Sequence, residues 1–264
     1  MPPSHSQSVL AAVCDDARAD APAPDAQQWS ALFIVASPRP LTGKTFLARL
    51  IVEFLRVDGR AVEAFDLDPG ETALAETLPA LTVRAGLETT QAQMTLFDRF
   101  VLTDGVPKVV DLGHALFTRF FALVEEIGFI EEARRRAIET IVLFAADAQP
   151  ASVKAYAELQ RRFPATVLVP VFNEAILKGR RLREQYPFSR AAAVPLQIPA
   201  LSPGLKAHAD RSGQSFADFH GQLPASAPVG PAFELRSWTK RTFLEFRELE
   251  LRLLMEKLRA SLKG

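Results

Sequence analysis

The chain has 264 residues, of which 48% are hydrophobic and 23% are charged, so it is long enough to bury one sizeable core. Its formal net charge is zero, which excludes a global electrostatic attraction to nucleic acid or to an anionic membrane. A single cysteine, Cys14, excludes an internal disulfide and a cysteine metal site, and the four scattered histidines argue against a histidine-rich metal site.

Residues 1–29 are rich in Ala, Pro, Asp, Ser and Gln, a composition typical of a disordered tail. They lack the basic and then apolar pattern of a signal peptide. No apolar run in the chain approaches the roughly 20 residues that a membrane helix needs. With one thiol and no leader, we expect a cytoplasmic protein whose folded part begins near residue 30.

From residue 30 onward, short apolar runs typical of buried strands alternate with amphipathic segments typical of helices. The pattern predicts strands at 31–36, 61–66, 108–112, 138–145, 166–172 and 192–198. It predicts helices at 45–57, 91–102, 115–127 and 151–162. This alternation indicates an α/β fold with a predominantly parallel sheet and helices on both faces.

The last part of the chain is set apart by composition. Residues 221–231 are rich in Pro, Gly, Ala and Ser and are predicted to be a linker between a domain at 30–220 and the segment 232–264. Residues 233–262 have the pattern of one long amphipathic helix. The helix is expected to pack on its own sheet. A partner or dimer contact and a membrane-surface role are the alternatives, and the mixed charges of its polar face disfavour the membrane.

The segment SPRPLTGKT (37–45) joins the first predicted strand to the first predicted helix. In a phosphate-binding loop at this position, backbone N–H groups face the phosphates, a lysine reaches the outer phosphates and a hydroxyl ligates Mg²⁺. Gly43, Lys44 and Thr45 fit these roles, and an ordinary strand-to-helix turn is the alternative. Pro38 stands where the usual motif has its first glycine, and it removes one N–H from the cradle.

A second motif, DLDPG (66–70), follows the second predicted strand. Together with the loop, it resembles the ParA/MinD-like P-loop ATPases. Members of that family carry a deviant Walker A motif, KGGxGK[ST], and a D-x-D-P element after the second strand. Arg39 stands where the family has its signature lysine, while Pro40 and Leu41 replace two of its glycines. The resemblance covers about residues 30–220.

Two later segments continue the resemblance. KVVDLG (108–113) is similar to the Walker B strand of the family, with Asp111 at its acidic end. VPVFN (169–173) is similar to the strand whose terminal asparagine, here Asn173, reads adenine. The alternatives are a carboxylate that only ends a strand and an asparagine that only caps the next helix.

The resemblance implies a site for ATP and Mg²⁺ at the carboxyl edge of the sheet, where ligands bind in open α/β folds. The residues implied to bind the nucleotide are Leu41, Thr42, Gly43, Lys44, Thr45, Phe46 and Asn173. Those implied to hold Mg²⁺ are Thr45, Asp66 and Asp111. Those implied to act in hydrolysis are Lys44, Asp68 and Arg39, with Arg39 reaching the nucleotide of a partner subunit. Ordinary turn chemistry is the alternative for the two aspartates of the DLDPG motif.

The function implied by the resemblance is slow ATP hydrolysis coupled to an ATP-dependent homodimer, which positions or partitions a cargo through an unidentified protein. Two alternatives stay open. One is a nucleotide-binding scaffold without hydrolysis, since the loop has lost glycines. The other is a P-loop small-molecule kinase or ligase, for which no acceptor motif is visible.

Two basic runs and one histidine are further candidates for ligand contacts. The basic runs at 134–136 and 178–181 are expected to be solvated, with non-specific DNA contact as the alternative. Association with a membrane is not expected. His114 is expected to begin a helix without binding a ligand, and a contact with the γ-phosphate is the alternative.

Overall fold

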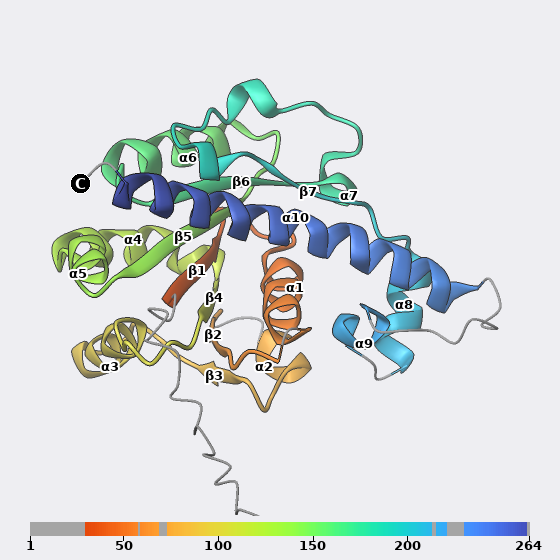
Figure 1. Ribbon diagram of the computed structural model, residues 1–264. Helices are drawn as coiled ribbons and strands as arrows, with labels where there is room; N and C mark the ends of the chain where they lie inside the picture. The colour runs from red at the N-terminus through yellow and green to blue at the C-terminus, as the bar shows by residue number, and fades with distance from the viewer. Residues whose placement is uncertain (1–29, 58, 69–72, 213–214, 221–229, 263–264) are drawn as a thin grey trace, which may run out of the picture.

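The computed structural model of the chain describes residues 30–57, 59–68, 73–212, 215–220 and 230–262. The predicted tail at 1–29 and most of the predicted linker lie outside the described residues. Within them, seven strands form one sheet in the order β3-β2-β4-β1-β5-β6-β7, and every neighbouring pair is parallel (Figure 1). The strands are β1 (Ser30–Ala36), β2 (Glu63–Leu67), β3 (Thr82–Arg84), β4 (Lys108–Leu112), β5 (Ile138–Ala145), β6 (Val167–Asn173) and β7 (Leu196–Ile198).

Helices connect the strands and cover the sheet (Figure 1). The α-helices are α1 (Lys44–Val57), α2 (Ala73–Thr77), α3 (Thr90–Phe100), α4 (Phe117–Glu126), α5 (Phe129–Arg135), α6 (Pro150–Arg162), α7 (Glu174–Leu177), α8 (Pro203–Ser212), α9 (Phe216–His220) and α10 (Pro231–Ser261). Short 3-10 helices occur at η1 (His114–Leu116), η2 (Arg183–Gln185) and η3 (Ala191–Ala193). The predicted α/β class with a long C-terminal helix is therefore confirmed.

The alternating side chains of β1 divide the interior into two cores. Phe33 and Val35 pack in one core with apolar side chains of α1 and α10. Leu32 and Ile34 face the opposite way and pack with side chains of α3, α4, α5 and α6. Because successive side chains of a strand point to opposite faces, this division confirms the prediction of helices on both faces of the sheet.

The long helix α10 is part of the first core. Its buried face carries Leu235, Phe243, Phe246, Leu249 and Leu253. The packing on the domain's own sheet is therefore confirmed. The helix already begins at Pro231, a residue predicted to end the linker, because proline is favoured in the first turn of a helix. None of the described helices has both the length and the apolar character to cross a membrane.

The last predicted strand is too long. Only Leu196–Ile198 forms β7, and residues 191–193 form η3 instead. The backbone N–H of Ala192 donates to the carboxylate of Glu256 on α10 at 2.7 Å, so a contact distant in sequence stabilises the turn. A contact between residues so far apart in the chain cannot be predicted from the local periodicity of the sequence.

Candidate functional site

The connection between β1 and α1, here called the β1–α1 loop (residues 37–43), lies at the carboxyl edge of the parallel strands. A pocket of about 350 Å³ opens beside it. The residues that line the pocket are Pro40, Leu41, Gly43, Lys44, Thr45, Phe46, Asp68 and His114. The structure thus brings most of the predicted loop residues together with Asp68.

Lys44 occupies the first position of α1, and its side chain turns back toward the loop. The residue is only 6% exposed. Its Nζ donates a hydrogen bond to the backbone carbonyl of Arg39 at 3.0 Å. A buried ammonium group at a helix N-terminus beside an open pocket supplies positive charge where backbone N–H groups also converge, which favours an anion.

Asp66 and Asp111 sit side by side on adjacent strands, because they are paired in the register of β2 and β4. Asp111 is buried, and among the described residues neither of its carboxylate oxygens has a hydrogen-bond partner. Burial raises the pKa of Asp111 to about 7. The nearby Thr45 hydroxyl lowers the pKa of Asp111, although its contact with the carboxylate falls short of hydrogen-bond geometry. The negative charge of Asp66 raises the pKa further.

An unpartnered carboxylate near a threonine hydroxyl is suited to a hard divalent cation such as Mg²⁺, which prefers oxygen ligands and retains several waters. Nowhere in the described ranges do three or more His, Cys, Asp or Glu side chains form a cluster that could hold a metal ion. A magnesium ion here would therefore need phosphate oxygens or water to complete its coordination.

The other predicted metal ligand, Asp66, has a structural role. Its Oδ1 accepts a hydrogen bond from the N–H of Asp68 at 3.1 Å, and its Oδ2 accepts one from the N–H of Ala75 at 3.0 Å. The carboxylate therefore ties the end of β2 to α2. This is the turn chemistry that the sequence left open, and a metal-binding role remains a prediction.

His114 reaches the pocket because the ends of β2 and β4 meet very closely. The N–H of Gly113 donates to the carbonyl of Leu67 at 3.3 Å. A Cβ atom at Gly113 would lie 2.9 Å from the Cα of Asp68, so only glycine fits this position. The next residue, His114, begins η1 as predicted and lines the pocket beside Asp68, and a contact of its side chain with the γ-phosphate remains the alternative.

Arg39 forms an ion pair with Asp147 of its own chain, with 2.9 Å between Nε and Oδ2. Asp147 follows β5, and its other oxygen accepts a hydrogen bond from the N–H of Gln149 at 2.8 Å. The pair links the β1–α1 loop to the connection between β5 and α6. To reach a partner subunit, as the sequence predicts, Arg39 would have to leave Asp147.

Leu41 adopts a backbone conformation that is uncommon for its residue type. Its φ is +57°, in the left-handed region, and its side chain is 84% exposed at the rim of the pocket. Gly43 also has a positive φ, of +82°. Leu41 thus holds a conformation that glycine adopts without strain, at a position where the resembling family has glycine.

Asn173 and Phe46 connect the site to the rest of the fold. Asn173 caps α7, since its Oδ1 accepts a hydrogen bond from the N–H of Ala175 at 3.0 Å. Its amide also lies against the loop, because a Cβ at Gly43 would be 3.0 Å from its Nδ2. Phe46 lines the pocket and packs on Phe216, with 5.7 Å between ring centroids. A role of either residue toward adenine remains a prediction.

Fold and site together define a class: an α/β protein with a parallel sheet and a polar pocket at its carboxyl edge, between a strand-to-helix loop and strand-end aspartates. Comparison with models of known protein families gives no match, and no curated protein matches the sequence.

Proposed function

We propose that the pocket beside the β1–α1 loop binds ATP with Mg²⁺, and that the protein is a ParA/MinD-like ATPase. The observation that carries the proposal is that a buried cation and a buried carboxylate lie close together at one edge of the sheet. Lys44 begins α1, and Asp111, near the end of β4, has no hydrogen-bond partner among the described residues. The cation matches phosphate oxygens, and the carboxylate matches a hard metal ion.

In this proposal each residue acts on the triphosphate from the position described above. Lys44 and the N-terminus of α1 neutralise the outer phosphates, while Thr45 and Asp111 would hold Mg²⁺, which neutralises charge on the phosphate oxygens. Asp68 lines the pocket and orients the attacking water. Catalysis of phosphoryl transfer is mostly positioning and charge stabilisation, so these roles suffice for slow hydrolysis. A nucleotide-dependent homodimer that positions a cargo completes the proposal.

The test is the affinity for ATP with Mg²⁺, measured by titration calorimetry on the wild type and on Lys44→Ala. A hydrogen bond to a charged group contributes about 1.5–3 kcal/mol, so the variant should bind roughly 10- to 150-fold more weakly. Lys154→Ala, an exposed lysine on α6, is the matched control and should bind as the wild type does. Equal affinities of wild type and Lys44→Ala, or no binding by the wild type, would refute the proposal.

One observation favours a second candidate, a scaffold that binds the nucleotide without hydrolysing it. Pro38 and Pro40 have no N–H groups, and Arg39 is held by Asp147, so the loop offers fewer donors to the charge that develops during phosphoryl transfer. Phosphate release at saturating ATP separates the two candidates. Tight binding without release would favour the scaffold.

A further inference from the structure

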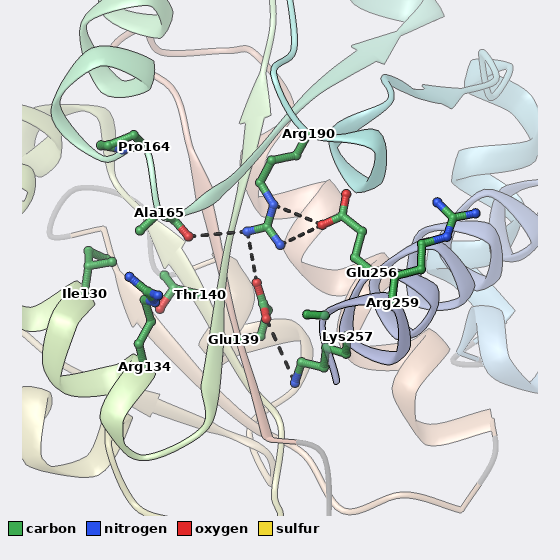
Figure 2. Close-up of a pocket in the computed structure, with 11 residues that line it drawn as sticks. Ile130, Arg134, Glu139, Thr140, Pro164, Ala165, Arg190, Glu256, Lys257 and Arg259 are labelled. Carbon is green, nitrogen blue, oxygen red and sulfur yellow. Dashed lines mark hydrogen bonds and ion pairs between the residues drawn. The ribbon is translucent and has the colours of Figure 1, made fainter. Parts of the chain in front are cut away.

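Figure 2 shows a second cavity, of about 640 Å³. It lies at the opposite edge of the sheet from the β1–α1 loop. It is bounded by α5, by the start of β5, by the residues before β6 and by the C-terminal turns of α10. Since the strands are parallel, their amino ends meet here, whereas the proposed nucleotide pocket lies at their carboxyl ends. The two cavities are therefore separate sites.

An ion-pair network forms part of the wall (Figure 2). Arg190 bridges two carboxylates, with 2.7 Å to Glu256 and 3.2 Å to Glu139, and it also donates to the carbonyl of Ala165 at 3.3 Å. Lys257 lies 3.9 Å from Glu139. Both carboxylates that line the cavity are thus already neutralised by cations.

Two further arginines line the cavity and give its wall an excess of positive charge. Arg134 comes from α5 and Arg259 from α10, and in the described part of the chain neither has an ion-pair partner. Burial lowers the pKa of Lys257, the charge of Arg190 lowers it further, and Glu139 opposes the shift. With four cations and two carboxylates in its wall, the cavity has a surplus of two positive charges.

A threonine of β5 completes the wall. Thr140 lines the cavity and is only 5% exposed. Its Oγ1 is closed to solvent, so the charge of the wall, and not this hydroxyl, indicates the ligand. The surplus charge indicates that this ligand is an anion.

We propose that this cavity binds a small phosphate monoester. A phosphate monoester carries nearly two negative charges at pH 7, which matches the surplus. Arginine guanidinium groups pair bidentately with phosphate oxygens. Ile130, Pro164 and Ala260 supply apolar wall for a compact organic body. The volume lies within the range of about 300–1,000 Å³ that is usual for small-molecule sites. The proposal does not depend on the proposed ATPase function.

Phenyl phosphate is a suitable probe, because it joins a doubly charged phosphate to a compact apolar ring. Titration calorimetry should detect binding to the wild type and weaker binding of phenyl sulfate, which has a single charge. Arg134→Gln and Arg259→Gln should each bind phenyl phosphate about tenfold more weakly. The matched control is Arg135→Gln on the same helix, since Arg135 pairs with Glu132 and does not line the cavity. It should bind as the wild type does.

A phosphate ester could also enter the pocket beside the β1–α1 loop, so Lys44→Ala is titrated in parallel. Retained binding in this variant supports the amino-edge site. Binding that is lost in Lys44→Ala but kept in Arg134→Gln overturns it, as does no binding by the wild type at millimolar concentration. Both arginines are exposed, so neither substitution should change the melting temperature appreciably. Wild-type affinity in both arginine variants overturns the proposal as well.

Discussion

At the scale of single residues, the left-handed conformation of Leu41 makes a specific stability prediction. A side chain in this region costs about 1–2 kcal/mol, and this one is too exposed to recover the cost by burial. Glycine removes the strain but adds about 0.5–1 kcal/mol of chain entropy to be lost on folding. We expect Leu41→Gly to raise the free energy of unfolding by about 0.5–1 kcal/mol in a urea titration.

The matched control is Leu102→Gly. Leu102 is also an exposed leucine, but its φ is not positive, so glycine brings only the entropic penalty and should destabilise the protein. Destabilisation by both substitutions, to the same extent, would mean that Leu41 is not strained in solution.

Residue-scale prediction from sequence depended on local signals. Gly43, Lys44 and Thr45 are predicted because a strand precedes them and a helix follows, and Asp111 because KVVDLG resembles a Walker B strand. The ion pair of Arg39 with Asp147 joins residues from two different loops, so no local pattern reveals it. The contact of Asn173 with Gly43 was missed for the same reason.

At the scale of elements, the packing of α10 can be tested by comparing substitutions on its buried face and on its exposed face. Phe246 is 1% exposed and packs on Phe54 of α1, with 5.5 Å between ring centroids, whereas the nearby Leu244 is 62% exposed. Phe246→Ala should lower the free energy of unfolding by about 3–5 kcal/mol, because it leaves a cavity in the core. Leu244→Ala should change it by less than about 0.5 kcal/mol. Thermal or urea denaturation followed by circular dichroism measures both, and equal effects would contradict this packing.

The contact between α1 and α9 depends on a buried carboxylate. Glu53 accepts hydrogen bonds from Arg49 at 2.7 Å and from the N–H of Ala217 at 3.1 Å. Burial raises the pKa of Glu53 above its ordinary 4.5, although Arg49 opposes the shift. The folded state therefore binds this proton more tightly than the unfolded state. The stability that results is fully present below about pH 4.5 and is lost as the pH rises through the raised pKa.

Glu53→Gln removes this titration. We expect the free energy of unfolding of the wild type, relative to Glu53→Gln, to fall as the pH rises from 4 to 8, by about 1.4 kcal/mol for each unit by which folding raises the pKa. Urea denaturation of both proteins across this range measures the difference. A difference that is constant, or that grows with pH, would show that folding does not raise the pKa of Glu53.

Long, strongly patterned elements were predictable and short ones were not. The strand predicted at 138–145 matches β5, and the helix predicted at 45–57 matches α1 to within one residue. The edge strand β3 has three residues, of which two are exposed, so it lacks an apolar run. The short helices α2 and α9 are each five residues long, too short for a helical period to appear. The equally short α7 was indicated only by Asn173 as the residue that would cap it.

At the scale of the whole molecule, the ion pair of Arg39 bears on the proposed dimer. Because Arg39 is 41% exposed, its pair with Asp147 contributes about 0.2–1 kcal/mol in each subunit, so releasing Arg39 in both subunits should strengthen ATP-dependent dimerisation by at most about thirtyfold. Asp147→Asn removes the charge and keeps an acceptor for the N–H of Gln149. Arg39→Ala should abolish dimerisation while ATP still binds to the monomer.

Sedimentation velocity with ADP and with a non-hydrolysable ATP analogue compares the wild type with both variants. A wild type that stays monomeric when the analogue saturates the protein would show that Arg39 has no cross-dimer role. Weaker dimerisation in Asp147→Asn would show that the ion pair supports the dimer.

The central position of β1 in the sheet also bears on the order in which the chain folds. Of the described strands, β1 is the first to leave the ribosome, yet its neighbours are β4 and β5, where Leu32 pairs with Lys108 and with Thr140. Closing such long loops is entropically unfavourable until both ends can pack, and parallel sheets with distant pairings fold slowly. The apolar segment of β1 therefore stays unpaired until β4 and β5 have been synthesised. During that time it is a natural binding site for chaperones and the segment most exposed to aggregation.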